Sequence, residues 1–141
     1  MALLGGVRDA AQTAEYLERN LAHWEQYAHG VYLVRARDTG EVAGMGCLRH
    51  LQLDERAEIE IGYLLFPVHW GRGLATEIAI ACRDLGFTLA GVESLIAVTH
   101  PQNRASQRVM EHVGMSYERD TLLNGQPIVV YRGSRPGRVD G

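Results

Sequence analysis

Apolar and polar positions alternate along residues 57–66, and this alternation predicts a half-buried strand in the middle of the chain. One face of that strand carries acidic residues and a glycine, and the other carries larger apolar residues: Glu58, Glu60 and Gly62 against Ile59, Ile61 and Tyr63. Pro67 ends the strand because it has no N–H to donate to a ladder. Helical spacing follows the glycine-containing segment 70–75 and continues to Leu85. Residues 57–87 therefore predict a strand, a glycine loop and a helix.

The same patterns predict the elements on either side of this unit. An apolar stripe predicts an amphipathic helix over residues 9–27, and a further helix starts after residues 100–103 and stops at Gly114. Gly44 and Gly46 lie in a predicted strand and mark either a bulge or a close backbone approach. Strands are predicted over residues 31–36, 42–49, 93–99, 115–119 and 128–132, with turns at 38–40, 52–56 and 124–125.

The order of these elements predicts the fold class. A strand, a helix and a strand in the middle require a right-handed crossover and one parallel pair, whereas the flanking hairpins require antiparallel pairing. We therefore expect an α/β fold of the α+β kind, with a mixed, mostly antiparallel sheet and helices on both faces. No internal repeat or linker divides the chain, so we expect a single domain over residues 1–133 and a disordered tail over 134–141.

Composition narrows the function classes without choosing one. The chain has 141 residues, of which 46% are hydrophobic and 22% charged, and its net charge is −3 with no basic run. These values predict a soluble globular protein and argue against nucleic-acid binding as its main role. The apolar runs are too short for a membrane span or a signal peptide, and Cys47 and Cys82 lack metal-ligand spacing. We expect a cytoplasmic protein with two reduced thiols, no metal and no membrane partner.

The glycine loop before the central helix predicts an anion site. Glycines that lead into a helix N-terminus present free backbone N–H groups and the positive end of the helix dipole, which suit a phosphate or pyrophosphate. The loop is not a nucleotide-binding P-loop, because no Gly-Lys-Ser/Thr follows four free positions. It is also a poor dinucleotide fingerprint, because Thr76 stands where that motif needs glycine or alanine. A structural role, in which the glycines let the helix pack close to the sheet, stays open.

Two motifs taken together carry a family resemblance. The first is Pro67-x-x-Trp70-Gly71-Arg72-Gly73-Leu74-Ala75-Thr76-Glu77, preceded by Glu60-Ile61-Gly62-Tyr63-Leu64-Leu65, and the second is Asn103-x-x-Ser106-x-x-Val109, which ends at Gly114-Met115. In this order they resemble the acyl-CoA signature of the GNAT superfamily of N-acyltransferases. The expected helix at 9–27 and turn at 38–40 resemble the branch of the RimJ/RimL ribosomal-protein N-terminal acetyltransferases. The resemblance spans residues 9–132 and is specific for the superfamily but not for a substrate.

The resemblance implies an acetyl-CoA site around the glycine loop and no metal. The central strand would splay from the next strand at a bulge near Leu64 and Leu65, so that its free backbone groups pair with the pantetheine arm. Asn103 matches the superfamily asparagine that contacts pantetheine, and Ser106 lies one turn on. The loop amides would hold the CoA pyrophosphate, with added charge from the arginine, through Trp70, Gly71, Arg72, Gly73, Leu74, Ala75 and Thr76.

The chain departs from the family pattern in two places. The tyrosine that commonly protonates the departing CoA thiolate would fall at Met110, which cannot donate a proton, and Ser106 is the nearest replacement. The family also usually opens with a strand and a helix before the element placed at 9–27, and these normally form part of the acceptor groove. Residues 1–7 hold neither. Three explanations stay open: the elements are lost, the start is misassigned or truncated, or a partner chain in a homodimer covers the gap.

The expected activity is transfer of an acetyl group from acetyl-CoA to a primary amine, either a peptide N-terminus or a small molecule. The amine must be neutral to attack, and Glu60 is the first candidate for the general base, directly or through a water. Glu58, on the same face, and His100, at the end of the next strand, are the alternatives. A backbone N–H near Leu65 would meet the thioester oxyanion.

Two functions from other classes compete with this enzyme. The first is a non-catalytic acyl-CoA-binding or regulatory domain, which Met110 and the missing front elements favour, whereas Glu60, Asn103 and Ser106 favour the enzyme. The second is an unrelated nucleotide-phosphate binder, and the absence of a lysine after the glycines argues against it.

Overall fold

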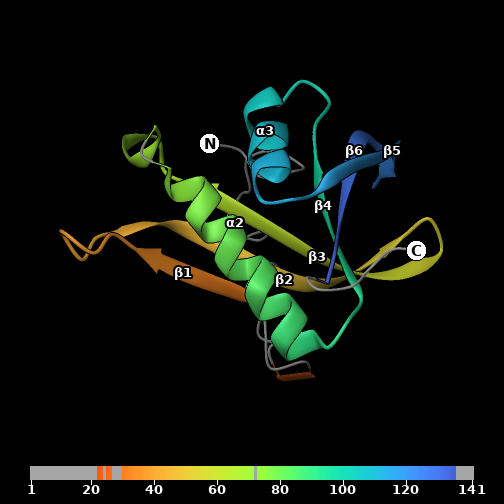
Figure 1. Cartoon of the computed structure of the whole chain (residues 1–141), viewed down its shortest axis with the longest axis horizontal. Coiled ribbons are helices and arrows are strands. Elements are labelled where there is room, and N and C mark those ends of the chain that lie inside the picture. The colour runs from red at the N-terminus through yellow and green to blue at the C-terminus, as the bar shows by residue number, and fades with distance from the viewer. Residues whose placement is uncertain (1–21, 24, 27–29, 72, 136–141) are drawn as a thin grey trace.

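The computed structural model describes residues 22–23, 25–26, 30–71 and 73–135 of the chain (Figure 1). Its main feature is one six-stranded sheet in the order β1-β2-β3-β4-β6-β5. All neighbouring strands are antiparallel except β3 and β4, which are parallel. The predicted fold class, a mixed and mostly antiparallel sheet with one central parallel pair, is confirmed.

The strands and helices follow the predicted order along the chain. Helix α2 lies between the parallel strands β3 and β4 and forms the expected crossover, and helix α3 follows β4. No helix in the described part of the chain is long and apolar enough to cross a membrane. The helix predicted over 9–27 lies outside the described residues, apart from residues 22–23 and 25–26, which are helical. The elements are β1 (Val31–Arg35), β2 (Val42–Leu53), β3 (Arg56–Leu65), η1 (Pro67–His69), α2 (Leu74–Leu85), η2 (Gly86–Ala90), β4 (Ser94–Thr99), α3 (Arg104–His112), β5 (Ser116–Leu123) and β6 (Gln126–Ser134).

Helices α2 and α3 pack on the same face of the sheet, so these two helices do not bear out the prediction of helices on both faces. Ile59 and Ile61 of β3 belong to one buried cluster with Ile78 of α2 and Met110 of α3. A smaller buried cluster lies on the other face, because its members alternate in sequence with those of the first on β4 and β6. It consists of Leu53, Ile96, Val98, Ile128 and Val130. The predicted alternation along β3 therefore sends its isoleucines to the helices and its glutamates to the opposite face.

The hairpin of β2 and β3 is longer than predicted. The turn expected over 52–56 is wrong in its extent, because β2 runs to Leu53 and β3 begins at Arg56. Only Asp54 and Glu55 form the turn, and their φ values of 49° and 64° are left-handed, as a two-residue hairpin turn requires. The shorter turn fixes the register of every residue in the two strands.

The last hairpin is also longer than predicted. β5 and β6 extend well beyond residues 115–119 and 128–132, around the predicted turn at 124–125. Ser134 pairs with Ser94, and the Arg135 amide donates to the Glu93 carbonyl oxygen at 2.9 Å. The first two residues of the predicted tail, Ser134 and Arg135, are therefore hydrogen-bonded to the rest of the fold. Residues 136–141 of that segment lie outside the described residues.

Gly44 marks a close approach between β2 and β3. A Cβ atom at this position would lie 1.9 Å from the Leu64 carbonyl oxygen, so only glycine fits without moving the backbone. The register of β1 against β2 also shifts at this level, between Val34 and Arg35. The stretch therefore shows both features that its glycines predicted, a bulge and a close backbone approach.

Candidate active site

A cleft opens where β3 and β4 separate. One parallel bridge, between Glu60 and Ile96, joins these strands, whereas β2 and β3 stay paired from Gly44↔Leu65 to Leu53↔Arg56. Beyond the bridge the two strand ends border a cavity of about 700 Å³, which we call the β3–β4 cleft. The predicted splay is present. The predicted bulge near Leu64 and Leu65 does not appear in the β2–β3 pairing, so the cleft arises from divergence of the two strands.

The glycine loop opens onto this cleft at the N-terminus of α2. Gly71 and Gly73 have φ values of 80° and 73°, and a Cβ atom at either would meet nothing within 4 Å. Gly73 is the N-cap, and no described side chain caps the helix. The first intrahelical bond runs from the Glu77 amide to the Gly73 carbonyl oxygen at 3.1 Å. The amides of Leu74, Ala75 and Thr76 therefore have no intrahelical acceptor. These three residues line the cleft, so their free amides suit an anion there.

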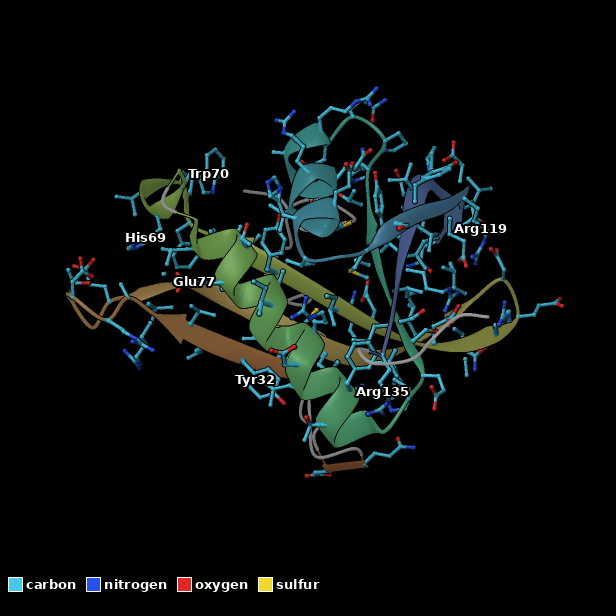
Figure 2. All side chains as sticks on the ribbon, viewed as in Figure 1. Tyr32, His69, Trp70, Glu77, Arg119 and Arg135 are labelled. Carbon is cyan, nitrogen blue, oxygen red and sulfur yellow. The ribbon has the colours of Figure 1, made fainter. Side chains whose placement is uncertain are left out.

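Trp70 links this loop to the end of β3. Figure 2 shows it with His69 on the loop before α2. Its indole Nε1 donates to the Leu65 carbonyl oxygen at 3.0 Å, while 55% of the residue stays exposed. The predicted strand end at Pro67 is confirmed, since η1 starts there. Arg72, which was expected to add charge to the loop, lies outside the described residues.

The backbone of β3 faces the cleft at Leu65. The Phe66 amide donates to the Ala43 carbonyl oxygen of β2 at 2.9 Å. Successive amides in a strand point to opposite edges, so the Leu65 amide points away from β2 and toward the cleft. No ladder pair joins Leu65 to β4. This amide can therefore meet an oxygen atom of a bound molecule.

Glu60 lies at the buried end of the cleft and is paired. Its carboxylate accepts a hydrogen bond from Arg49 Nε at 2.6 Å, and only 3% of the residue is exposed. Arg49 also lines the cleft, and its side chain is 35% exposed. Arg49 was not among the site residues predicted from the sequence. The signal that could have found it is the Asp54-Glu55 turn, because that turn places Arg49 opposite Glu60.

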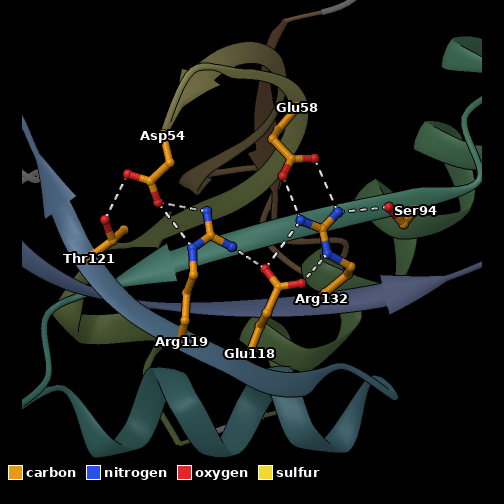
Figure 3. Close-up of polar contacts among 7 residues, drawn as sticks. All are labelled: Asp54, Glu58, Ser94, Glu118, Arg119, Thr121 and Arg132. Carbon is orange, nitrogen blue, oxygen red and sulfur yellow. Dashed lines mark hydrogen bonds and ion pairs between the residues drawn. The ribbon is translucent and has the colours of Figure 1, made fainter.

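The two alternative bases lie in different surroundings. Glu58 is absent from the residues that line the cleft, and its carboxylate accepts from Arg132 Nη2 at 2.5 Å and Nη1 at 3.1 Å (Figure 3). His100 lines the cleft just beyond the end of β4. The structure therefore brings Glu60 and His100 to one cleft and holds Glu58 elsewhere.

The second motif supplies the opposite wall of the cleft. Asn103 is the N-cap of α3, and its side-chain oxygen accepts from the Ser106 amide at 3.1 Å. Both residues line the cleft, as does Met110, which is 5% exposed. Tyr63 of β3 reaches this wall, and its hydroxyl donates to Ser106 Oγ at 3.3 Å. Burial raises the pKa of Tyr63, and the bond to Ser106 opposes that rise.

Neither cysteine has the environment of a reactive thiol. Both are unpaired, as predicted. Burial, reinforced by the nearby charge of Glu60, raises the pKa of Cys47, and burial raises the pKa of Cys82 to about 11. Among the described residues, no group of three or more His, Cys, Asp or Glu side chains is placed to hold a metal ion.

Comparison with known sequences gives one family. Residues 1–116 match the family described as Acetyltransferase (GNAT) domain. The uncharacterized protein YkkB of Bacillus subtilis (strain 168) is 34% identical over 131 residues, which are 93% of this chain and 76% of that protein. Spermidine N(1)-acetyltransferase of Escherichia coli (strain K12) is 30% identical over 92 residues, 62% of this chain and 48% of that protein.

Solved structures show the same architecture. An acetyltransferase from Agrobacterium tumefaciens str. C58 has a TM-score of 0.79 at 32% identity, over 94% of this chain and 76% of that chain. A ribosomal-protein-S5-alanine acetyltransferase from Vibrio fischeri has a TM-score of 0.73 at 16% identity, over 93% and 78% of the two chains. At 16% identity the likeness concerns the fold alone.

Proposed function

This chain belongs to the acetyltransferase (GNAT) domain family, and on that premise we propose that it transfers the acetyl group of acetyl-CoA to a primary amine. The observation that carries the proposal is the β3–β4 cleft, which joins an uncapped helix N-terminus to a buried carboxylate. The helix N-terminus suits a pyrophosphate, and the buried carboxylate suits an amine. One cavity can therefore hold both substrates.

Acetyl-CoA would bind along the wall that β3 and the glycine loop form. The amides of Leu74, Ala75 and Thr76 would hold the pyrophosphate at the positive end of the α2 dipole. The pantetheine arm would follow the open edge of β3 near Leu64 and Leu65, with Asn103 on the opposite wall. Trp70, Gly71, Arg72 and Gly73 complete the proposed cofactor site.

Glu60 would act as the general base for the acceptor. A lysine-like amine with a pKa of ~10.4 is almost wholly charged at neutral pH, whereas an α-amine near 7.7–8.0 is partly neutral. A positioned base contributes about 10²–10⁴-fold in rate. Arg49 would orient the Glu60 carboxylate, because its Nε contacts one of the two carboxylate oxygens.

The backbone amide of Leu65 and the Ser106 hydroxyl would stabilise the negative charge that develops on the thioester. The neutral amine attacks the thioester carbon, and the Leu65 amide donates to the oxyanion that forms. The intermediate collapses with loss of the CoA thiolate, to which Ser106 donates in place of the tyrosine that Met110 replaces. Loss of one oxyanion donor typically costs ~2.7–4 kcal/mol of transition-state stabilisation.

The acceptor classes to test come from the similar proteins. One is named for spermidine and another for the alanine of a ribosomal protein, so a polyamine and a peptide with N-terminal alanine represent the two. The proposal places the reaction in the cytoplasm, which the two unpaired cysteines support because free thiols persist there. A non-catalytic acyl-CoA-binding domain is the second candidate, favoured by Met110.

Thermal unfolding with acetyl-CoA and with ATP tests the cofactor first. At a ligand concentration of 100 Kd we expect a stabilisation of ~2.7 kcal/mol by acetyl-CoA. ATP carries phosphates but no pantetheine arm, so we expect a smaller shift. No shift with millimolar acetyl-CoA would rule out both candidates. Thiol release in the presence of each amine then separates the enzyme from the non-catalytic domain.

A further inference from the structure

Tyr63 and Ser106 form a hydroxyl pair across the β3–β4 cleft. The Tyr63 hydroxyl donates to Ser106 Oγ at 3.3 Å, and both residues line the cavity. Ser106 lies in the first turn of the nine-residue helix α3, where Asn103 fixes its backbone. Ser106 is the residue proposed to donate to the departing CoA thiolate, so the pair lies next to the proposed position of the sulfur. The steps of the transfer described above give Tyr63 no part.

The chemistry of the two hydroxyls sets the direction of their hydrogen bond. A phenol is a stronger acid than an aliphatic alcohol, so Tyr63 is the better donor and Ser106 Oγ the better acceptor. Burial raises the pKa of Tyr63, which keeps the phenol protonated at neutral pH. A serine hydroxyl has one proton and two lone pairs. When the Tyr63 hydroxyl donates to one lone pair of Ser106 Oγ, the proton of Ser106 points to a third group.

We propose that Tyr63 is a positioning residue for the leaving-group step: its hydroxyl turns the Ser106 proton toward the sulfur of CoA. This inference rests on the proposed function, because the sulfur is that of the proposed acetyl donor. Tyr63 acts through Ser106, which it reaches from β3 on the other side of the cleft. Met110 offers no donor there.

The step balances without a proton from either hydroxyl. The C–S bond of the tetrahedral intermediate breaks and its electron pair stays on sulfur, while the amine proton passes to Glu60 and then to water. A thiol is a far stronger acid than an alcohol, with a pKa of ~8.5 for an ordinary cysteine, so a thiolate can leave without full protonation. Ser106 therefore donates a hydrogen bond to the developing thiolate, and the N-terminal end of α3 adds the positive end of its dipole.

The ionisation of the thiol of bound CoA reports on the hydrogen bond from Ser106 to the thiolate, and it can be measured without an acceptor amine and without turnover. The ultraviolet absorbance of the thiolate is followed against pH for CoA bound to the unmodified protein, Tyr63→Phe, Ser106→Ala and the double variant. We expect the thiolate-to-thiol ratio to fall about fivefold in Tyr63→Phe and about tenfold in Ser106→Ala, with the double variant equal to Ser106→Ala. Tyr117→Phe is the control, because Tyr117 is 56% exposed and bonds to Asp120 outside the cleft.

Each outcome decides the proposal. Bound CoA with an unchanged thiolate ratio in Tyr63→Phe overturns the inference and leaves the proposed function standing. Failure of the unmodified protein to bind CoA overturns both. Losses that add up in the double variant also overturn it, because Tyr63 would then act independently of Ser106. If Tyr63→Phe unfolds at a lower temperature than the unmodified protein, Ser106→Ala is used to test the inference instead. A thiolate-to-thiol ratio in Ser106→Ala equal to that of the unmodified protein then overturns the inference.

Discussion

Arg49 Nε lies 2.6 Å from Glu60 Oε1, so a guanidinium contacts the carboxylate that is proposed to take the proton of the acceptor amine. The two residues face each other across β2 and β3. Arg49 reaches solvent with about a third of its side chain, whereas Glu60 is almost fully buried. The contact therefore holds the carboxylate in one orientation at the inner end of the cleft.

Replacement of Glu60 by glutamine tests its role as the base. Glu60→Gln keeps the size of the side chain but cannot accept a proton from the amine, so we expect kcat to fall about 10²–10⁴-fold. Acetyl-CoA should still stabilise the variant as it does the unmodified protein. Glu58→Gln is the matched control on the same strand, because Glu58 lies outside the cleft. A larger loss of kcat in Glu58→Gln than in Glu60→Gln would show that Glu60 is not the general base.

The elements that border the cleft could be predicted from sequence because each is local, whereas the splay that opens the cleft was implied by the family resemblance. The strand ends just before Pro67, the loop holds Gly71 and Gly73, and the helix begins at Leu74, all within one stretch of the sequence. The second wall followed from the Asn103 motif. Each of these elements is specified by its own residues, and the parallel crossover brings the two walls together.

The contacts across strands could not be predicted in the same way. Arg49 meets Glu60 only because a two-residue turn of Asp54 and Glu55 sets the register, and that dipeptide is a weak hairpin signal compared with Asn-Gly. A turn over 52–56 gives no such pair. The bond from Tyr63 to Ser106 likewise depends on how far β3 and β4 diverge, which no local pattern encodes.

Gly44 should tolerate no side chain. Alanine at this position would bring its Cβ to 1.9 Å from the Leu64 carbonyl oxygen, and backbone atoms have to move to relieve that contact. We expect Gly44→Ala to lower the free energy of unfolding by about 3 kcal/mol in urea titrations. Gly40→Ala is the control, because Gly40 has a positive φ but open space around it, and it should cost only about 1 kcal/mol. Equal losses would mean that the close approach is not the cause.

Cys82 should react slowly with alkylating reagents. Burial raises its pKa to about 11, so at pH 8 only about one thiol in a thousand is the reactive thiolate. The alkylation rate should keep rising through about pH 10, past the pKa of an ordinary cysteine. Mass spectrometry after timed iodoacetamide treatment measures the rate, and the guanidinium-unfolded chain is the control. Rapid native labelling that levels off near pH 8.5–9 would contradict this environment.

Arg132 on β6 joins three other strands of the sheet through its guanidinium (Figure 3). Its guanidinium contacts Glu58 on β3 at 2.5 Å, Glu118 on β5 at 2.7 Å and Ser94 on β4 at 2.8 Å. β3 and β4 share one bridge, so these contacts hold the two halves of the sheet together where the ladder is short.

Removal of Arg132 should destabilise the fold. Arg132→Met keeps an unbranched apolar stem but leaves the buried Glu58 carboxylate without its cation, and we expect a loss of about 3 kcal/mol in the free energy of unfolding. Arg35→Met is the control, because Arg35 is exposed and its guanidinium donates to the Gly40 carbonyl oxygen in a loop. It should change stability by no more than about 0.5 kcal/mol. The double variant Arg132→Met, Glu58→Met should recover part of the loss, because it removes the unpaired charge as well.

Acid should weaken the same network. The hydrogen bond from Arg132 holds the pKa of Glu118 below its ordinary value of 4.5, and bonds from Thr121 and Arg119 lower the pKa of Asp54. A carboxyl whose pKa is lower in the folded state adds stability above its unfolded pKa, and that stability is lost as the pH falls through the folded pKa. We therefore expect the urea midpoint to fall as the pH is lowered from about 5 to about 3.

Glu118→Gln tests the part that Glu118 plays in this pH dependence. The variant should have a lower urea midpoint than the unmodified protein at about pH 7 and differ less from it at about pH 3, because Glu118 of the unmodified protein is then protonated and also uncharged. Glu41→Gln, at an exposed position, should match the unmodified protein throughout, and a constant difference between Glu118→Gln and the unmodified protein would contradict the linkage.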